Sequence, residues 1–141
     1  MQALNQAWRE SRIGTRDGVR REQGGWLYAR NGQIVVRRAR SGGSAMINLQ
    51  NPPTVRGAIL VGNFHTHPGF AAQDFVPDPS VNDQINAFWR GVPGLVISEG
   101  MTITPFGPNR RGSNPNVALN PSDPRITGYP GNSVNTTGCP P

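Results

Sequence analysis

The feature that most constrains the fold is an apolar run, Ala58–Val61, which leads within a few residues into His65-Thr66-His67-Pro68. Such a short run predicts a strand over Val55–His67, with Ala58–Val61 buried on both faces. Residues two apart on a strand point to the same side, so the imidazoles of His65 and His67 should lie together. The chain therefore presents two potential metal ligands at the end of a buried strand.

A capped helix is predicted to begin at Ser80 and to continue to Arg90, before a glycine and a proline end it. Ser80 and Asp83 form a capping-box pattern, in which the serine caps the helix and the acid stands three residues on. The same spacing puts Asp83 in the first turn, from which its carboxylate could reach the histidines. Two imidazoles, one carboxylate and a fourth position left for water are typical of catalytic rather than structural zinc.

A glutamate upstream of the histidines could serve as the general base for such a site. Glu22 directly precedes a predicted strand, and that strand could lie beside the histidine strand. Glu10 instead fits the exposed face of a helix, and Glu99 fits a turn between two short strands. Glu22 is therefore the predicted base.

The loop expected between the histidines and the helix carries two acids and two aromatic residues. Nothing in the spacing favours Asp74 or Asp78 over Asp83, although Asp78 offers an alternative ligand shell. Phe70 and Phe75 would lie beside the metal and are the candidates for substrate contact, because recognition residues often sit on loops over a cleft. Their alternative role is to anchor the loop.

The remaining elements alternate between helix and strand. Asn31-Gly32 is a strong hairpin signal. The order of elements predicts an α/β domain over residues 1–106, followed by an irregular arm or flexible tail over 107–141 that is rich in Pro, Gly and Asn. We expect a helix at 2–12, strands at 26–29, 33–37, 94–98 and 101–106, and an extended piece at 45–49.

The net charge of +6 comes from the N-terminal end of the chain. Residues 1–40 hold nine arginines against three acidic residues, whereas the rest of the sequence balances five against five. Such a patch could attract nucleic acid, an anionic polymer or an acidic protein, or it could be a solvated surface.

The sequence contains neither a long apolar run nor a signal-peptide core, so a soluble chain without a membrane segment is expected. Residence in the cytoplasm and export by a route without a cleaved signal both agree with this. The single cysteine, Cys139, excludes an internal disulfide framework and a thiolate metal cluster.

Two stretches, Gly62-Asn63-Phe64-His65-Thr66-His67-Pro68 and Pro79-Ser80-Val81-Asn82-Asp83, resemble the JAMM motif of JAB/MPN-domain metalloproteins, in which H-[ST]-H-P is followed by S-x-x-D. In that family a glutamate in an E-x-x-G setting opens an upstream strand, and Glu22-Gln23-Gly24-Gly25 matches it. The resemblance covers about residues 1–106. The spacer over 69–79 is longer than in eukaryotic deubiquitinases, so the chain is more similar to bacterial or phage-type members.

The resemblance implies a single JAB/MPN-like (cytidine-deaminase-like) domain, a curved mixed sheet flanked by helices. It implies zinc held by His65, His67 and Asp83, with Glu22 activating the water and Ser80 helping to hold the oxyanion. The implied reaction is metallopeptidase or isopeptidase hydrolysis of an amide bond in a protein or peptide substrate. The implied setting is a bacterial effector or toxin, or a phage-tail module.

Two other classes of function stay open. A JAB-like fold can persist without activity as a binding or assembly module, here with the C-terminal arm contacting a partner protein. Absence of metal, or a Glu22 remote from the histidines, would favour that class. A nucleic-acid-binding protein is the third class, suggested only by the arginines of residues 1–40; the aromatic platforms and base-reading motifs of such proteins are not evident.

Overall fold

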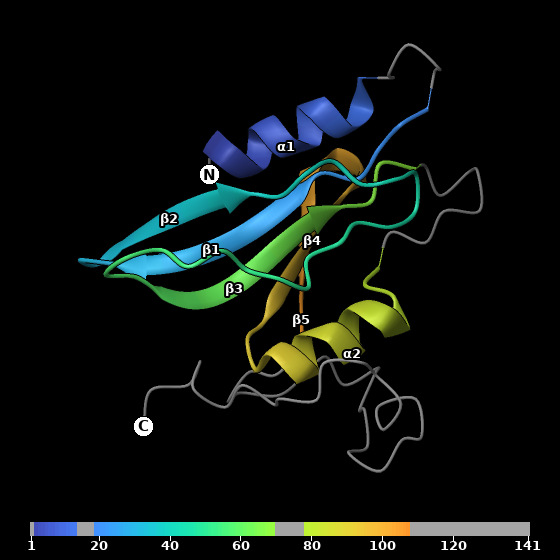
Figure 1. The fold of residues 1–141 in the computed structure, drawn as a ribbon. Helices are drawn as coiled ribbons and strands as arrows, with labels where there is room; N and C mark the ends of the chain where they lie inside the picture. Colours follow the sequence, from blue (N-terminus) through green and yellow to red (C-terminus); the bar gives the residue numbers. More distant parts are fainter. Residues whose placement is uncertain (1, 14–18, 70–77, 108–141) are drawn as a thin grey trace.

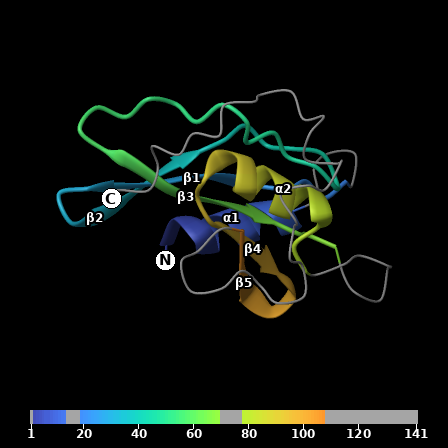
Figure 2. The same cartoon turned by 90° about the horizontal axis from the view of Figure 1, so that it is seen from below.

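The computed structural model describes residues 2–13, 19–69 and 78–107, and these form an α/β domain. Its helices are α1 (Gln2–Arg12) and α2 (Val81–Arg90), and its strands are β1 (Gly24–Arg30), β2 (Gln33–Arg38), β3 (Ile59–Thr66), β4 (Gly94–Ser98) and β5 (Thr102–Phe106). The strands form one mixed sheet in the order β2-β1-β3-β4-β5. Helix α1 lies against one face of the sheet and α2 against the other (Figures 1 and 2).

The hairpin of β1 and β2 confirms the predicted Asn-Gly turn. Asn31 and Gly32 have φ values of 50° and 73°. A tight type I′ turn requires positive φ at both central residues, which asparagine and glycine tolerate best. On its other edge β1 pairs antiparallel with β3, and this pairing places Gly24 opposite His65.

Gly24 and Gly25 are required by the close approach of the neighbouring strands. A Cβ atom on Gly24 would lie 2.5 Å from the carbonyl oxygen of Phe64, and one on Gly25 would lie 2.1 Å from that of Arg37. No larger residue fits at these distances without moving the backbone. The two glycines thus fix where the chain enters the sheet immediately after Glu22.

Strand β3 is the centre of the sheet, antiparallel to β1 and parallel to β4. Parallel neighbours need a crossover connection, and α2 provides it between β3 and β4. The first turn of α2 comes close to the end of β3, where His65 Nε2 lies 3.2 Å from Asp83 Oδ1. Open α/β sheets commonly bind ligands at this end of their strands.

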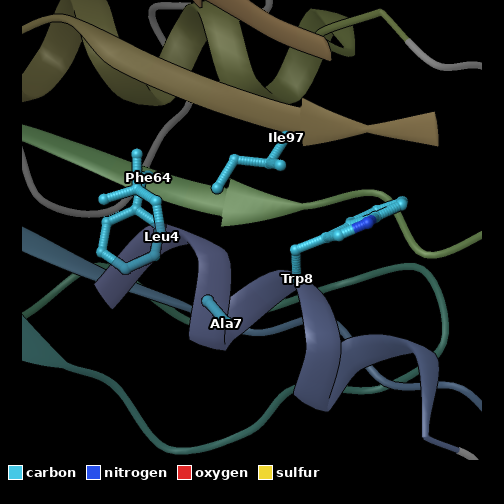
Figure 3. Close-up of a cluster of buried hydrophobic side chains, with 5 residues drawn as sticks. All are labelled: Leu4, Ala7, Trp8, Phe64 and Ile97. Carbon is cyan, nitrogen blue, oxygen red and sulfur yellow. The ribbon is translucent and has the colours of Figure 1, made fainter. Parts of the chain in front are cut away.

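Helix α1 covers the face of the sheet opposite to α2. Leu4, Ala7 and Trp8 share one side of the helix and pack against Phe64 and Ile97 (Figure 3). Phe64 and Ile97 are completely buried, with 0% exposure each. Because side chains alternate along a strand, a buried Phe64 on the α1 face directs the next residue to the opposite face.

That opposite face is covered in two parts. Trp26, Tyr28 and Leu49 form a buried cluster beneath the segment 39–58, and the Trp26 indole donates to the Leu49 carbonyl oxygen at 3.2 Å. Ala87 of α2 packs against Val96 and Phe106 of the neighbouring strands. The segment 39–58 and α2 therefore flank the end of β3 from two sides.

One strand prediction is wrong in part. Residues 55–58 do not belong to a strand, because Gly57 adopts a φ of 69° within a turn and β3 begins only at Ile59. Ile59 is 56% exposed, so burial on both faces fails at this residue. The segment 45–49 lies in a loop without strand pairing, and its Leu49 is buried by packing on the Trp26 cluster. The other helices and strands lie within two residues of their predicted bounds.

The predicted C-terminal arm lies outside the described residues from 108 onward. Gly107 is buried, and its N–H donates to Gln84 Oε1 of α2 at 3.1 Å, which ties the end of β5 to this helix. In the described part of the chain, no helix combines the length and the apolar character that crossing a membrane needs.

Candidate metal centre

The two histidines lie where β3 ends. His65 is 3% exposed and belongs to the strand, whereas His67 follows its last residue, Thr66. Thr66 donates its N–H to the Gln23 carbonyl oxygen at 2.8 Å, and His67 donates to that of Ile97 at 2.9 Å. These bonds keep the backbone extended past the strand, so the imidazoles share one side, as predicted, with their Nε2 atoms 3.1 Å apart.

Asp83 is held by the helix cap that the sequence predicts. The N–H and the hydroxyl of Ser80 both donate to Asp83 Oδ2 at 2.7 Å, and the Asp83 N–H donates back to Ser80 Oγ at 3.2 Å. This reciprocal bonding is a capping box with an aspartate as its acidic member. It leaves Asp83 Oδ1 3.2 Å from His65 Nε2, and Oδ2 lies 3.7 Å from His67 Nε2.

The spacing of these side chains fits a tetrahedral metal ion. His65, His67 and Asp83 each offer a donor atom, and the three atoms lie within 4.8 Å of one another. Ligands that bind zinc at about 2.0–2.1 Å with tetrahedral angles are about 3.3 Å apart. His65 Nε2 lies 3.1 Å from His67 Nε2 and 3.2 Å from Asp83 Oδ1, and the other carboxylate oxygen, Oδ2, lies 3.7 Å from His67 Nε2. The three residues can therefore hold a divalent ion, and such a mixed imidazole and carboxylate set accepts several of them.

The ionisation of Asp83 suits a metal ligand. Burial raises the pKa of this carboxyl, but the hydrogen bond and charge of His65, together with the hydrogen bonds from Ser80, outweigh burial and lower it to about 2. Asp83 is thus ionised at neutral pH, which is the form that binds a cation.

Glu22 lies beside these ligands, two residues before β1. Its N–H donates to the Gly43 carbonyl oxygen, and its own carbonyl oxygen accepts from the Gly42 N–H, both at 2.8 Å. The side chain is 5% exposed. Burial raises the pKa of Glu22 to about 7; the charge of His65 opposes this rise and that of Asp83 adds to it. A carboxyl group with a pKa near 7 can both take up and return a proton at neutral pH.

A cleft of about 710 Å³ opens between the segment 40–50 and α2, and it contains the whole candidate site. Glu22, which stands just before β1, and the histidines at the end of β3 line this cleft. All five residues predicted for the site line it: Glu22, His65, His67, Ser80 and Asp83. The predicted base is therefore close to the predicted ligands rather than remote from them.

The other acidic residues that were considered as metal ligands or as the general base do not join this site in the described part of the chain. Asp78 is exposed and does not join the cluster of possible ligands in the described ranges. Glu10 forms an ion pair with Arg38 at 2.7 Å, and Glu99 is exposed in the turn between β4 and β5. The other spacer acid and the two predicted substrate contacts lie outside the described residues: Asp74, Phe70 and Phe75.

Several residues that line the cleft were missed by sequence reasoning. On α2, the cleft is also lined by Asn82, Asn86 and Arg90, and their spacing of four residues is a signal that could have been found. Arg40 lines the opposite wall, and no local pattern marks it. Asn63 stands two residues before His65 and so shares its face of β3, next to the metal ligands.

The metal-free protein is expected to lose stability as the pH rises from about 4.5 to about 7, because the Glu22 carboxyl ionises near 4.5 when unfolded and near 7 when folded. The folded state binds more protons within this window, so the stability contribution is complete below the window and lost above it. The loss should reach roughly 3 kcal/mol. Urea unfolding of wild type and Glu22→Gln at several pH values checks this, since only the wild type should show the slope; parallel profiles would contradict it.

Ser80→Ala is expected to destabilise the protein by about 1 kcal/mol through loss of the helix cap. Metal affinity should also fall, by about 10-fold, because the hydroxyl that orients Asp83 is removed. Thermal unfolding and a zinc titration measure the two effects. Ser80→Thr keeps the hydroxyl and should preserve both; a Ser80→Ala variant with unchanged zinc affinity would show that Ser80 does not orient Asp83.

The arrangement can bind a cation, present a proton acceptor beside it and admit a ligand through an open cleft. His65 and His67 come from β3, Asp83 from α2, and Glu22 from the entry to β1, so three separate elements converge on the centre. Comparison of the chain with models of known protein families, with characterised proteins and with solved structures finds no match.

Proposed function

We propose that the protein is a zinc-dependent peptidase or isopeptidase of the JAMM type, which hydrolyses an amide bond in a protein or peptide. The observation that carries the proposal is the convergence of Glu22 with His65, His67 and Asp83 in one cleft. A three-ligand set with an open side and a neighbouring carboxyl of raised pKa is the arrangement that metallohydrolases use. The JAMM-like order of these residues along the chain supports the same reading.

Each residue of the site would have its own role in the hydrolysis. His65, His67 and Asp83 hold the zinc, which supplies Lewis acidity for the water and for the carbonyl oxygen. Glu22 accepts the proton of the attacking water and passes it to the leaving amine, for which its raised pKa is suited. Glu22 is 5% exposed and lines the cleft together with the candidate ligands.

Ser80 has a defined role in the resting site. Its hydroxyl has one hydrogen, and that hydrogen is donated to Asp83 Oδ2. Ser80 therefore orients a metal ligand, and its predicted contribution to the oxyanion requires that the hydrogen turn from Asp83 to the substrate.

The proposal is tested by metal content and by hydrolysis. Purified protein, and protein to which zinc has been added back and then dialysed, should each contain one zinc ion per chain by mass spectrometry. The loaded protein should cleave members of a peptide library, and 1,10-phenanthroline should stop cleavage while added zinc restores it. A chain that never retains zinc contradicts the proposal and favours a non-catalytic assembly module instead.

A further inference from the structure

Among the described residues, four charged side chains line the cleft, two acidic and two basic: Glu22, Asp83, Arg40 and Arg90. The two carboxylates belong to the proposed metal centre, where a divalent ion would balance their charge. The two guanidinium groups stand on opposite walls, one from the segment 40–50 and one from α2. With the two carboxylates balanced by a divalent ion, the two arginines would give the cleft a net positive charge, which attracts an anionic ligand.

A small side pocket lies beside the metal ligands, and it is lined by hydrogen-bond donors. Its volume is about 20 Å³, enough for one water-sized group. Asn63 is 1% exposed, and its Nδ2 has no hydrogen-bond partner among the described residues. Arg90 and Asn86 line the same pocket together with His65 and Asp83. A buried donor of this kind is unfavourable unless an acceptor reaches it.

Three apolar side chains, Ile47, Leu49 and Phe106, complete the lining of the pocket. A charge-assisted hydrogen bond is shorter and stronger than one between two neutral groups. Arg90 presents a planar fork of donors that matches a carboxylate.

We propose that this pocket is a carboxylate subsite, formed by Arg90 and Asn63, that selects substrates with an acidic group next to the cleaved amide. The inference rests on the proposed function, because the acidic group is placed relative to the amide that the proposed hydrolase would cleave. One carboxylate oxygen enters the pocket and accepts from Asn63 Nδ2, while the other faces Arg90. Arg40 on the opposite wall adds a second positive charge that favours acidic peptides over basic ones. The carboxylate comes from an Asp or Glu side chain or from a free peptide terminus.

The position of Arg90 also suits a purely structural role. It is the last residue of α2, where its positive charge interacts favourably with the end of the helix. Arg12 is its match, since it ends α1 and does not line the cleft. Arg12→Gln is therefore the control for Arg90→Gln. Asn63→Leu keeps a similar volume and removes the unpaired donor, so it should raise the melting temperature of the protein while abolishing the subsite.

The experiment uses fluorescein-labelled alanine hexapeptides that carry one Glu, one Gln or one Lys at each position in turn, each with a free or an amidated carboxyl terminus. Binding to the full chain is measured by anisotropy, with Glu22→Gln used to prevent turnover, and cleavage by wild type is measured in parallel. A carboxylate at one position should improve binding and kcat/KM by about 10–100-fold over the matched amide. Arg90→Gln and Asn63→Leu should remove this preference, and Arg12→Gln should retain it.

The outcomes separate the two proposals. Binding of acidic peptides that depends on Arg90, without cleavage by wild type, keeps the subsite and rejects the hydrolase. Cleavage with equal rates for Glu and Gln peptides keeps the hydrolase and overturns the subsite. Loss of the acid preference in Arg12→Gln to the same extent as in Arg90→Gln overturns the subsite as well. A preference for Glu over Gln that persists when the carboxyl terminus is amidated assigns the carboxylate to the side chain.

Discussion

Zinc binding is expected to fall by more than about 100-fold when His65, His67 or Asp83 is replaced. Loss of a residue that only orients a ligand lowers metal affinity about 10–100-fold, and loss of a ligand itself must exceed this. Each of the three residues offers one donor atom, and these atoms lie within 4.8 Å of one another, so removal of any one leaves only two protein ligands. Competition with a chromophoric chelator measures the affinities, and mass spectrometry measures the metal content.

The variants His65→Gln, His67→Gln and Asp83→Asn suit this experiment, because they preserve volume in a buried site. Asn at position 83 can still accept from the Ser80 hydroxyl, so the helix cap is kept. Asp78→Asn is the matched control, since Asp78 is exposed and lies outside the cluster. Circular dichroism confirms folding of each variant. Full zinc content in folded Asp83→Asn would refute the ligand set, and zinc loss in Asp78→Asn would point to the alternative shell.

Glu22→Gln is expected to lower kcat by about 10²–10⁴-fold and to leave zinc content unchanged. Glutamine occupies the same volume and cannot take a proton, so the effect isolates proton transfer from shape. The buried carboxyl lies in the cleft with the metal ligands and carries a pKa of about 7, which suits a proton carrier at neutral pH. Initial rates on the best peptide of the library, together with metal analysis, provide the measurement.

Two other glutamates of the chain serve as controls for this substitution. Glu99→Gln changes an exposed turn, and Glu10→Gln removes a surface ion pair with Arg38. Neither should change kcat, because neither residue lines the cleft. Wild-type turnover in Glu22→Gln would exclude Glu22 as the base. Equal losses in all three variants would show a general effect of charge rather than catalysis.

The juxtaposition of the three candidate metal ligands could be predicted because their signals are local. The alternation of a strand places His65 and His67 together, and a capping pattern fixes Asp83 within four residues of its cap. The turn at Asn31-Gly32 was predictable for the same reason. Each signal is complete within a few neighbouring residues, so no knowledge of the tertiary structure is needed to read it.

The rest of the site depends on contacts between distant segments. The wall formed by residues 40–50 has no regular secondary structure, and it covers the sheet because Leu49 packs on Trp26. Nothing in its own sequence indicates that packing. The pocket at Asn63 likewise appears only when α2 and Phe106 approach β3. The early start predicted for β3 fails because Gly57 turns the chain.

Two backbone hydrogen bonds, between Glu22 and the glycines at 42 and 43, join the segment that carries the predicted base to one wall of the cleft. Gly42 and Gly43 stand at the start of the same segment that borders the ligand on that side. Any shift of this wall is therefore transmitted to the backbone of Glu22, and with it to the position of the carboxyl relative to His65, His67 and Asp83.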